Sequence, residues 1–176
     1  FDTCGDETVS NTASFVTNDT STPGSDNWDI EISIPCYSCS LTQGYWKTHS
    51  QEYGPAAHPD DTWDLVGGPN ALFFISNKSY IQVLQTTPKG NAYYILAHQY
   101  IAAELNQENG AGFPSEIQVA FDDATTLFDN HLNTPANIAA LKGKSALRKQ
   151  FIELAGILGA FNEGTTNPAG HCDEQI

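Results

Sequence analysis

The segment Trp28–Ile34 alternates apolar and polar residues without exception. A period of two residues is typical of a β-strand with one buried face, because successive side chains of a strand point to opposite sides. The apolar side of this strand consists of Trp28, Ile30, Ile32 and Ile34. A weaker form of the pattern precedes it at Val9, Ala13 and Phe15, and residues 17–27 between them are rich in turn formers. The sequence therefore predicts an antiparallel pair of strands joined by an exposed loop.

After residue 69 the apolar residues recur every three or four positions, which indicates amphipathic helices. Helical segments are expected at residues 79–86, 91–109, 114–132, 135–141 and 145–162. Residues 40–70 contain several glycines and prolines and are expected to be irregular, with their large aromatic side chains packed rather than exposed. The predicted fold class is α+β, with a small antiparallel β segment in residues 1–39 and an α-helical bundle in residues 40–176.

Acidic residues outnumber basic residues by 21 to 7, which gives a formal net charge of -14. Such a field repels phosphate backbones, so we expect no nucleic-acid partner. The chain has no run of about 18 consecutive apolar residues, so we expect no membrane insertion. No Lys or Arg occurs in residues 1–46, whereas four cations lie close together at Lys142, Lys144, Arg148 and Lys149. This cluster either attracts the acidic part of a neighbouring copy or forms a solvated helix face.

The four cysteines are Cys4, Cys36, Cys39 and Cys172. The spacing of Cys36 and Cys39 is found in redox dithiols and in half of many zinc sites, but the residues after Cys39 predict a loop rather than the helix that follows a thioredoxin-type dithiol. An acidic, Lys-poor chain rich in Thr, Asn and Ser is typical of mature extracellular proteins, in which cysteines form disulfides. We expect two disulfides, and of the three connectivities we favour Cys39 with Cys172 and Cys4 with Cys36.

The expected location is extracellular or at a cell surface. Phe1 is not a translation start, which fits a chain from which a signal peptide has been removed. The segments that begin at Asn18 and Asn77 fit the N-glycosylation sequon, which matters only in a host that glycosylates.

A binding module is one alternative function. The candidate ligand-facing residues are Tyr45, Trp46, Lys47, His49 and Trp63. Aromatic rings stack on a glycan only when they are exposed, so burial of the tryptophans would count against this function. The candidate calcium ligands are Asp60, Asp61 and Asp64, whose carboxylates suit a hard cation. Their spacing is not that of an EF-hand, and a solvated acidic loop is the simpler interpretation.

A secreted hydrolase is the second alternative. Lys47 and His49, with His58 or Asp60, are the best available acid–base set, but the sequence contains no hydrolase motif. His98 lies on the apolar side of segment 91–109 and is expected to be a core histidine with satisfied hydrogen bonds. We therefore expect no catalytic residues, and no cofactor unless calcium binds.

Three motifs together resemble a known module: TQGYWKTH at residues 42–49, GNAYYILAHQYIAAELNQENGA at 90–111 and GHC at 170–172. Similar motifs occur near the C-terminus of large secreted or surface-anchored bacterial proteins. The resemblance covers residues 40–172 and implies an extracellular setting, but it implies no activity and no catalytic residues. The preceding segment, residues 9–36, looks like the closing strands of the immunoglobulin-like repeats that often precede this module. That likeness implies a partial sandwich whose earlier strands are missing from the chain.

An incomplete sandwich exposes an unpaired edge and an apolar face, which a neighbouring chain can complete by β-strand addition. The leading expectation is therefore a non-catalytic structural or adhesive surface module that forms a homo-oligomer or filament. Its self-association surface would consist of Trp28, Ile30, Ile32 and Ile34. A glycan- or calcium-binding module and a secreted hydrolase are the alternatives.

Overall fold

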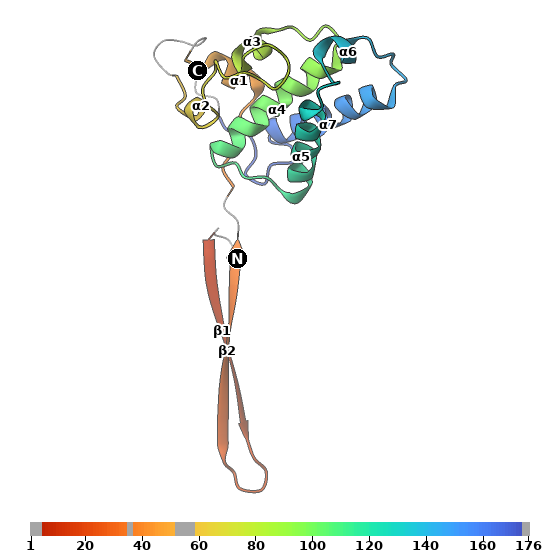
Figure 1. The fold of residues 1–176 in the computed structure, drawn as a ribbon. Helices are drawn as coiled ribbons and strands as arrows, with labels where there is room; N and C mark the ends of the chain where they lie inside the picture. Colours follow the sequence, from red (N-terminus) through yellow and green to blue (C-terminus); the bar gives the residue numbers. More distant parts are fainter. Residues whose placement is uncertain (1–4, 35–36, 52–58, 174–176) are drawn as a thin grey trace. The chain divides into compact units, whose positions relative to one another are not determined.

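A computed structural model describes residues 5–34, 37–51 and 59–173 (Figure 1). The chain divides into two compact units, Phe1–Cys36 and Tyr37–Ile176, with the division at residue 36 rather than at the 39 expected from the sequence. Within the described residues, the first unit holds a two-stranded antiparallel sheet and the second holds helices. The fold class is therefore α+β, as predicted.

The first unit is a β-hairpin of strands β1 (Gly5–Val16) and β2 (Pro23–Ile34). Its loop is closed by backbone hydrogen bonds, in which the Thr17 N–H donates to the Thr22 carbonyl and the Ser21 N–H donates to the Thr17 carbonyl, both at 3.0 Å. The loop is shorter than expected, because β2 begins at Pro23 although residues 23–27 are turn formers. Gly24 is held in the strand by the Phe15 ring opposite it, which occupies the space where a Cβ of residue 24 would lie.

The register gives the hairpin one largely apolar face and one largely polar face. Val9 pairs with Ile30 and Asn11 pairs with Trp28, so the predicted apolar residues of both strands share one face. The opposite face is polar, and there Ser10 Oγ donates to Asp29 Oδ1 and Thr12 Oγ1 donates to Asn27 Oδ1 across the strands. The alternation seen in the sequence thus predicted the faces of both strands.

The second unit contains seven helices in the described residues. They are α1 (Gln43–Thr48), α2 (Thr62–Leu65), α3 (Tyr80–Gln85), α4 (Ala92–Glu108), α5 (Ser115–Asp129), α6 (Pro135–Ala139) and α7 (Ala146–Asn162). Helices α3 to α7 correspond to the five expected segments. The short helices α1 and α2 lie in residues 40–70, where an irregular chain was expected, and that expectation was wrong for these residues.

Local signals explain where several helices begin. The side chains of Thr42 and Ser145 cap α1 and α7 by accepting the N–H groups of Tyr45 and Arg148. Ser79 forms a reciprocal capping box with Gln82 at the start of α3. These caps satisfy N–H groups that have no partner inside their own helix.

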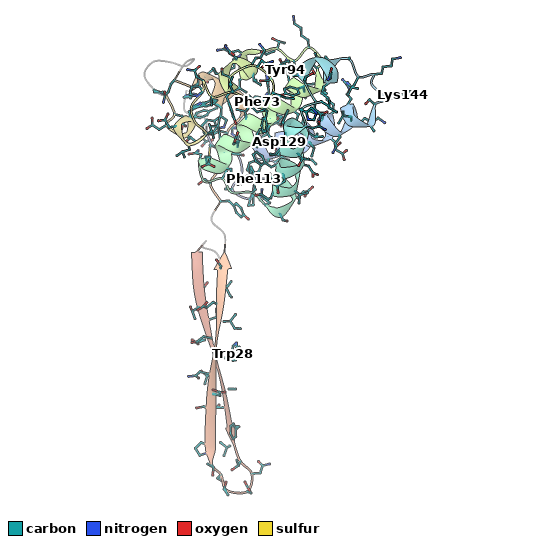
Figure 2. All side chains as sticks on the ribbon, viewed as in Figure 1. Trp28, Phe73, Tyr94, Phe113, Asp129 and Lys144 are labelled. Atoms are coloured by element: carbon teal, nitrogen blue, oxygen red, sulfur yellow. A yellow bond between two sulfur atoms is a disulfide. The ribbon has the colours of Figure 1, made fainter. Side chains whose placement is uncertain are left out.

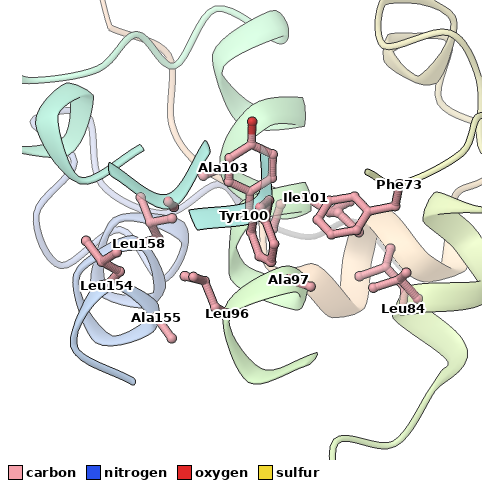
Figure 3. Packing of buried hydrophobic residues seen from close by; sticks show 14 of the residues in the cluster. Phe73, Leu84, Leu96, Ala97, Tyr100, Ile101, Ala103, Leu154, Ala155 and Leu158 are labelled. Carbon is pink, nitrogen blue, oxygen red and sulfur yellow. The ribbon is translucent and has the colours of Figure 1, made fainter. Parts of the chain in front are cut away.

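Helix α4 lies at the centre of the second unit and contacts all six of the other helices (Figure 1). It is therefore buried on most sides, as its nearly continuous apolar sequence predicted. Its own Leu96 and Ile101 are fully buried, as are Phe73 and Leu158 from other segments (Figure 3). Aromatic rings fill much of this core, and Phe73 alone has edge contacts with Tyr93, Tyr100 and Phe128.

Candidate functional site

The apolar face of the hairpin is the largest exposed apolar feature of the first unit. Trp28, which Figure 2 labels, is 74% exposed, Phe15 is 63% exposed and Ile30 is 47% exposed. Val9 and Ile32 are half-buried. Ile34 continues the alternation in β2 opposite Gly5. Residues of this kind are normally buried, so the face is a candidate interaction surface.

The two outer edges of the hairpin carry backbone groups that point away from the partner strand. In an antiparallel pair, residues that bond to each other alternate with residues whose N–H and C=O groups point outward. The Thr17 N–H donates to the Thr22 carbonyl, so these two residues form a bonded pair. Because bonded pairs alternate with outward-pointing pairs along the register, Thr12 and Asn27 form an outward-pointing pair. The outward groups therefore belong to residues of the polar face, and each edge offers a strand-length row of donors and acceptors.

The motif TQGYWKTH is joined to α4 by a buried amide, that of Asn106. Asn106 Oδ1 accepts the Leu41 N–H at 2.8 Å and the Trp46 Nε1–H at 3.2 Å. Its Nδ2 donates to the Leu41 carbonyl at 2.8 Å and to Asn162 Oδ1 at 3.0 Å. All four polar positions of this fully buried side chain are thus used, and they join α1, α4 and α7.

A second group of amides continues this network toward the surface. Asn162 Nδ2 donates to the carbonyl of Gln99 at 2.9 Å and to its Oε1 at 3.0 Å, and Gln99 Nε2 donates to Gln43 Oε1. The Gln of the TQGYW motif and the Gln of the AHQ motif therefore bond to each other. Their positions in the fold give both motifs a structural role.

The two tryptophans of this region are not ligand-facing. Trp46 and Trp63 are both 0% exposed, and Trp63 Nε1 donates to the Trp46 carbonyl at 3.2 Å. The expectation that the large aromatic side chains of residues 40–70 are packed holds for these two rings, and their burial counts against the alternative in which they stack on a glycan. Of the five candidate ligand-facing residues, only Tyr45, Lys47 and His49 are partly exposed.

Tyr45 lies between His49 and Asp60. Its ring stacks on the His49 ring at a centroid distance of 4.0 Å, and its hydroxyl donates to Asp60 Oδ2 at 3.0 Å. The other oxygen of Asp60 accepts the Thr62 N–H at 2.9 Å, which orders the start of α2. In this arrangement His49 and Asp60 are held by Tyr45 and by backbone groups, as expected for a structural corner. His58 lies outside the described residues.

The three aspartates proposed as calcium ligands have separate surroundings. Asp60 is engaged as described above, Asp64 Oδ1 accepts a hydrogen bond from Gln51 Nε2 at 3.0 Å, and Asp61 is exposed. Among the described residues, no three His, Cys, Asp or Glu side chains are arranged to hold a metal ion. Calcium binding at these residues stays a prediction.

Cys39 and Cys172 form a disulfide across a sequence separation of 133 residues, as predicted. This bond leaves neither sulfur available for a zinc site or for a dithiol with Cys36. The expected partner pair, Cys4 and Cys36, lies outside the described residues. Beside the disulfide, the Ser40 N–H donates to the Gly170 carbonyl at 3.0 Å, and the Cys172 N–H donates to the Ser40 carbonyl at 2.9 Å.

Among the titratable side chains that α4 places in the core region are His98 and Glu104. His98 Nε2 lies 2.8 Å from the Val83 carbonyl and 3.1 Å from the Thr86 carbonyl, which is the satisfied core histidine expected from the sequence. Burial lowers its pKa below the ordinary value. Burial also raises the pKa of Glu104 to about 7, although a hydrogen bond with Tyr80 lowers it. In the described structure Glu104 Oε2 is buried without a hydrogen-bond partner.

The sequence did not single out Glu104 or Asn106. The spacing of Glu104 from His98 and Ile101 placed it near the buried side of α4, and a polar residue there was the available signal. The partners of both residues lie far away in the chain, so no local pattern could identify them.

Comparisons with known protein families, with curated proteins and with solved structures found no match to this chain. None of the helices in the described residues combines the length and the apolar character needed to span a bilayer. The resemblance of residues 40–172 to a bacterial surface module therefore stays a prediction.

Proposed function

We propose that the chain is a non-catalytic extracellular structural module that associates with other copies of itself through its hairpin, as the subunit of an oligomer or filament. The observation that carries this proposal is the exposed apolar face, on which Trp28 is 74% exposed and Ile30 is 47% exposed. Exposed apolar faces of this kind are typical of surfaces that another chain covers.

The marginal stability of an isolated hairpin supports the proposal. Two strands with one apolar face are marginally stable in water, because nothing covers that face. The described residues of the first unit provide no third strand and no helix. Association with another copy would supply the missing cover, and the hairpin would be stabilised at the same time as the assembly.

The outer edges of the hairpin supply a second means of association. Each strand has 12 residues, and the register directs every second N–H and C=O group along it outward from the hairpin. A strand of a neighbouring copy could pair along either edge, as in β-strand addition. The edges contain no Lys and the only Pro is Pro23 at the start of β2, so they lack two devices with which proteins commonly block such pairing.

The disulfide supports the extracellular part of the proposal. Disulfides form and persist in oxidising compartments and are rare in the cytosol of most organisms. The Cys39–Cys172 bond closes a loop that contains most of the second unit, so it is well placed to stabilise that unit outside the cell.

Sedimentation velocity and negative-stain microscopy on the purified chain test the proposed association. We expect Trp28→Thr to shift the assembly toward monomer, because it removes the largest exposed apolar side chain of the face. The matched control is Asn27→Thr, which places the same residue at the next position, on the polar face. It should assemble like the unmodified chain.

Two outcomes would count against the proposal. One is an unmodified chain that remains monomeric at tens of micromolar. The other is equal assembly of Trp28→Thr and Asn27→Thr, which would show that the apolar face takes no part. Circular dichroism of both variants establishes that the helices of the second unit remain folded.

A further inference from the structure

Five of the seven basic residues of the chain gather at one end of the second unit. They are Lys89, Lys142, Lys144, Arg148 and Lys149, and we call them the basic corner. The Arg148 guanidinium donates to the Gly90 carbonyl at 3.2 Å, which brings the loop that carries Lys89 beside the start of α7. Lys144 lies at this end of the unit (Figure 2). No Asp or Glu occurs between residues 130 and 152, so no acidic residue of this segment neutralises the corner.

An apolar surface adjoins the basic corner. Leu132 is 63% exposed, and its carbonyl accepts a hydrogen bond from Asn137 Nδ2 at 2.8 Å, which places it next to α6. Helix α6 points Ile138 into the core, so its alanines at 136 and 139 are exposed, as is Ala140 after it. This end of the unit therefore combines exposed apolar side chains with cations.

The hairpin has the complementary properties. Residues 5–34 contain six carboxylates and no Lys or Arg. The register places Glu7 and Asp26 on the apolar face, together with Trp28 and Ile30. If two hairpins packed with their apolar faces together, these carboxylates would be desolvated close to their own copies. Like charges brought together in this way disfavour the contact.

We propose that the basic corner is the surface that receives the apolar face of the hairpin of a second copy. This inference rests on the self-association proposed above and names the surface of the partner. Strand addition at the edges extends a sheet but leaves its faces uncovered, so the face needs a separate cover. The adjoining apolar surface supplies side chains for Trp28 and Ile30, and the basic corner supplies cations for Glu7 and Asp26.

The geometry of such a contact favours an open chain of subunits. The surface on one copy differs from the surface on the next, so the contact is heterologous rather than two-fold symmetric. Heterologous contacts build filaments when the rotation does not close into a ring. Each copy in the chain would donate one hairpin and receive one.

Charge reversal at one residue of each surface tests the inference by sedimentation velocity at low ionic strength. We expect Lys144→Glu in the corner and Asp26→Lys on the hairpin each to weaken association by about tenfold, because each places like charges in contact. The chain with both substitutions should recover most of the lost affinity. Lys78→Glu and Asp123→Lys are the matched controls, since they make the same changes of charge outside both surfaces, and they should have little effect.

The outcomes separate this inference from the proposed function. If the unmodified chain stays monomeric, both fail. If it assembles and Lys144→Glu behaves like Lys78→Glu, the corner is not the partner surface and the inference alone fails. It also fails if Lys144→Glu changes the sedimentation coefficient in a way that does not depend on concentration, because the hairpin would then contact the corner of its own chain.

Discussion

The side-chain amide of Asn106 bonds to the backbone of Leu41 in the way that a neighbouring β-strand would. Its amide bonds to both the N–H and the C=O of that residue, and it also bonds to Trp46 Nε1. These are backbone and side-chain groups that burial would otherwise leave without partners. The start of the TQGYW motif is therefore fixed by one side chain from a distant helix.

Removal of this amide should be costly. We expect Asn106→Ala to lower the free energy of unfolding by roughly 3 to 5 kcal/mol, because several buried donors and acceptors lose their partner at once. Urea denaturation followed by tryptophan fluorescence measures the change. The control is Asn137→Ala, which removes an exposed amide from α6 and should cost less than about 1 kcal/mol. Equal effects of the two substitutions would contradict the role assigned to Asn106.

Glu104 should make the stability of the chain depend on pH. Its pKa is raised by burial from the ordinary value of 4.5 to about 7, so the folded chain retains a proton that the unfolded chain releases. The free energy of unfolding should therefore fall as the pH rises from about 4.5 to about 7 and then level off. A pKa difference of this size corresponds to roughly 3 kcal/mol.

The variant Glu104→Gln tests this dependence. It should reduce the difference in stability between pH 5 and pH 8, measured by urea denaturation at both values. Glu153→Gln, at an exposed position of α7, should leave the difference unchanged. The assignment would be wrong if Glu104→Gln retained the full pH dependence of the unmodified chain.

At the scale of elements, proline substitutions can distinguish association through the strand edges from association through the apolar face. The N–H of Thr12 points outward from the hairpin, so Thr12→Pro should block strand addition at that edge while the bonds between β1 and β2 remain. Ala13→Pro is the matched control, because the N–H of the next residue points into the hairpin and its loss should weaken the hairpin itself. Sedimentation velocity and far-UV circular dichroism distinguish the two variants. Assembly of Thr12→Pro at the level of the unmodified chain would show that the β1 edge is not used.

The sequence predicted those elements whose signals are local. The alternation at Trp28–Ile34 predicted that part of β2 and its apolar face, and the apolar spacing after residue 69 predicted the helices from α3 onward. Helix α1 was not predicted because it includes Gly44 and buries only Trp46, so its sequence has no repeated apolar spacing. Its stability comes from Trp46 and from the distant Asn106, and no short window of sequence contains both.

The same limit applies to the candidate site. Exposure is a property of the whole fold, so the aromatic character of Trp28 and of Trp46 could not distinguish an exposed ring from a buried one. Trp28 lies on a face that the described residues of the first unit leave uncovered, whereas Trp46 is buried where α1 meets α2 and α4. The pairing of Cys39 with Cys172 could be predicted because these two cysteines lie before and after the helical segments.

At the scale of the whole molecule, the disulfide closes a loop that contains nearly all of the second unit. In the chain-entropy model, a loop of 133 residues corresponds to about 5 kcal/mol of stabilisation. We expect the double substitution Cys39→Ser and Cys172→Ser to lower the free energy of unfolding by about 3 to 5 kcal/mol, measured by urea denaturation with Cys4 and Cys36 left in place. An unchanged denaturation midpoint would contradict a stabilising role.

The position of this disulfide also determines how the second unit responds to tension. A force applied between the hairpin and the residues after Cys172 passes through the sulfur–sulfur bond and bypasses the helices between them. While the bond is intact, pulling cannot extend those helices. Reduction would release roughly 400 Å of extensible chain. For a force applied at these two points, the bond between Cys39 and Cys172 therefore carries the load in place of the helices between them.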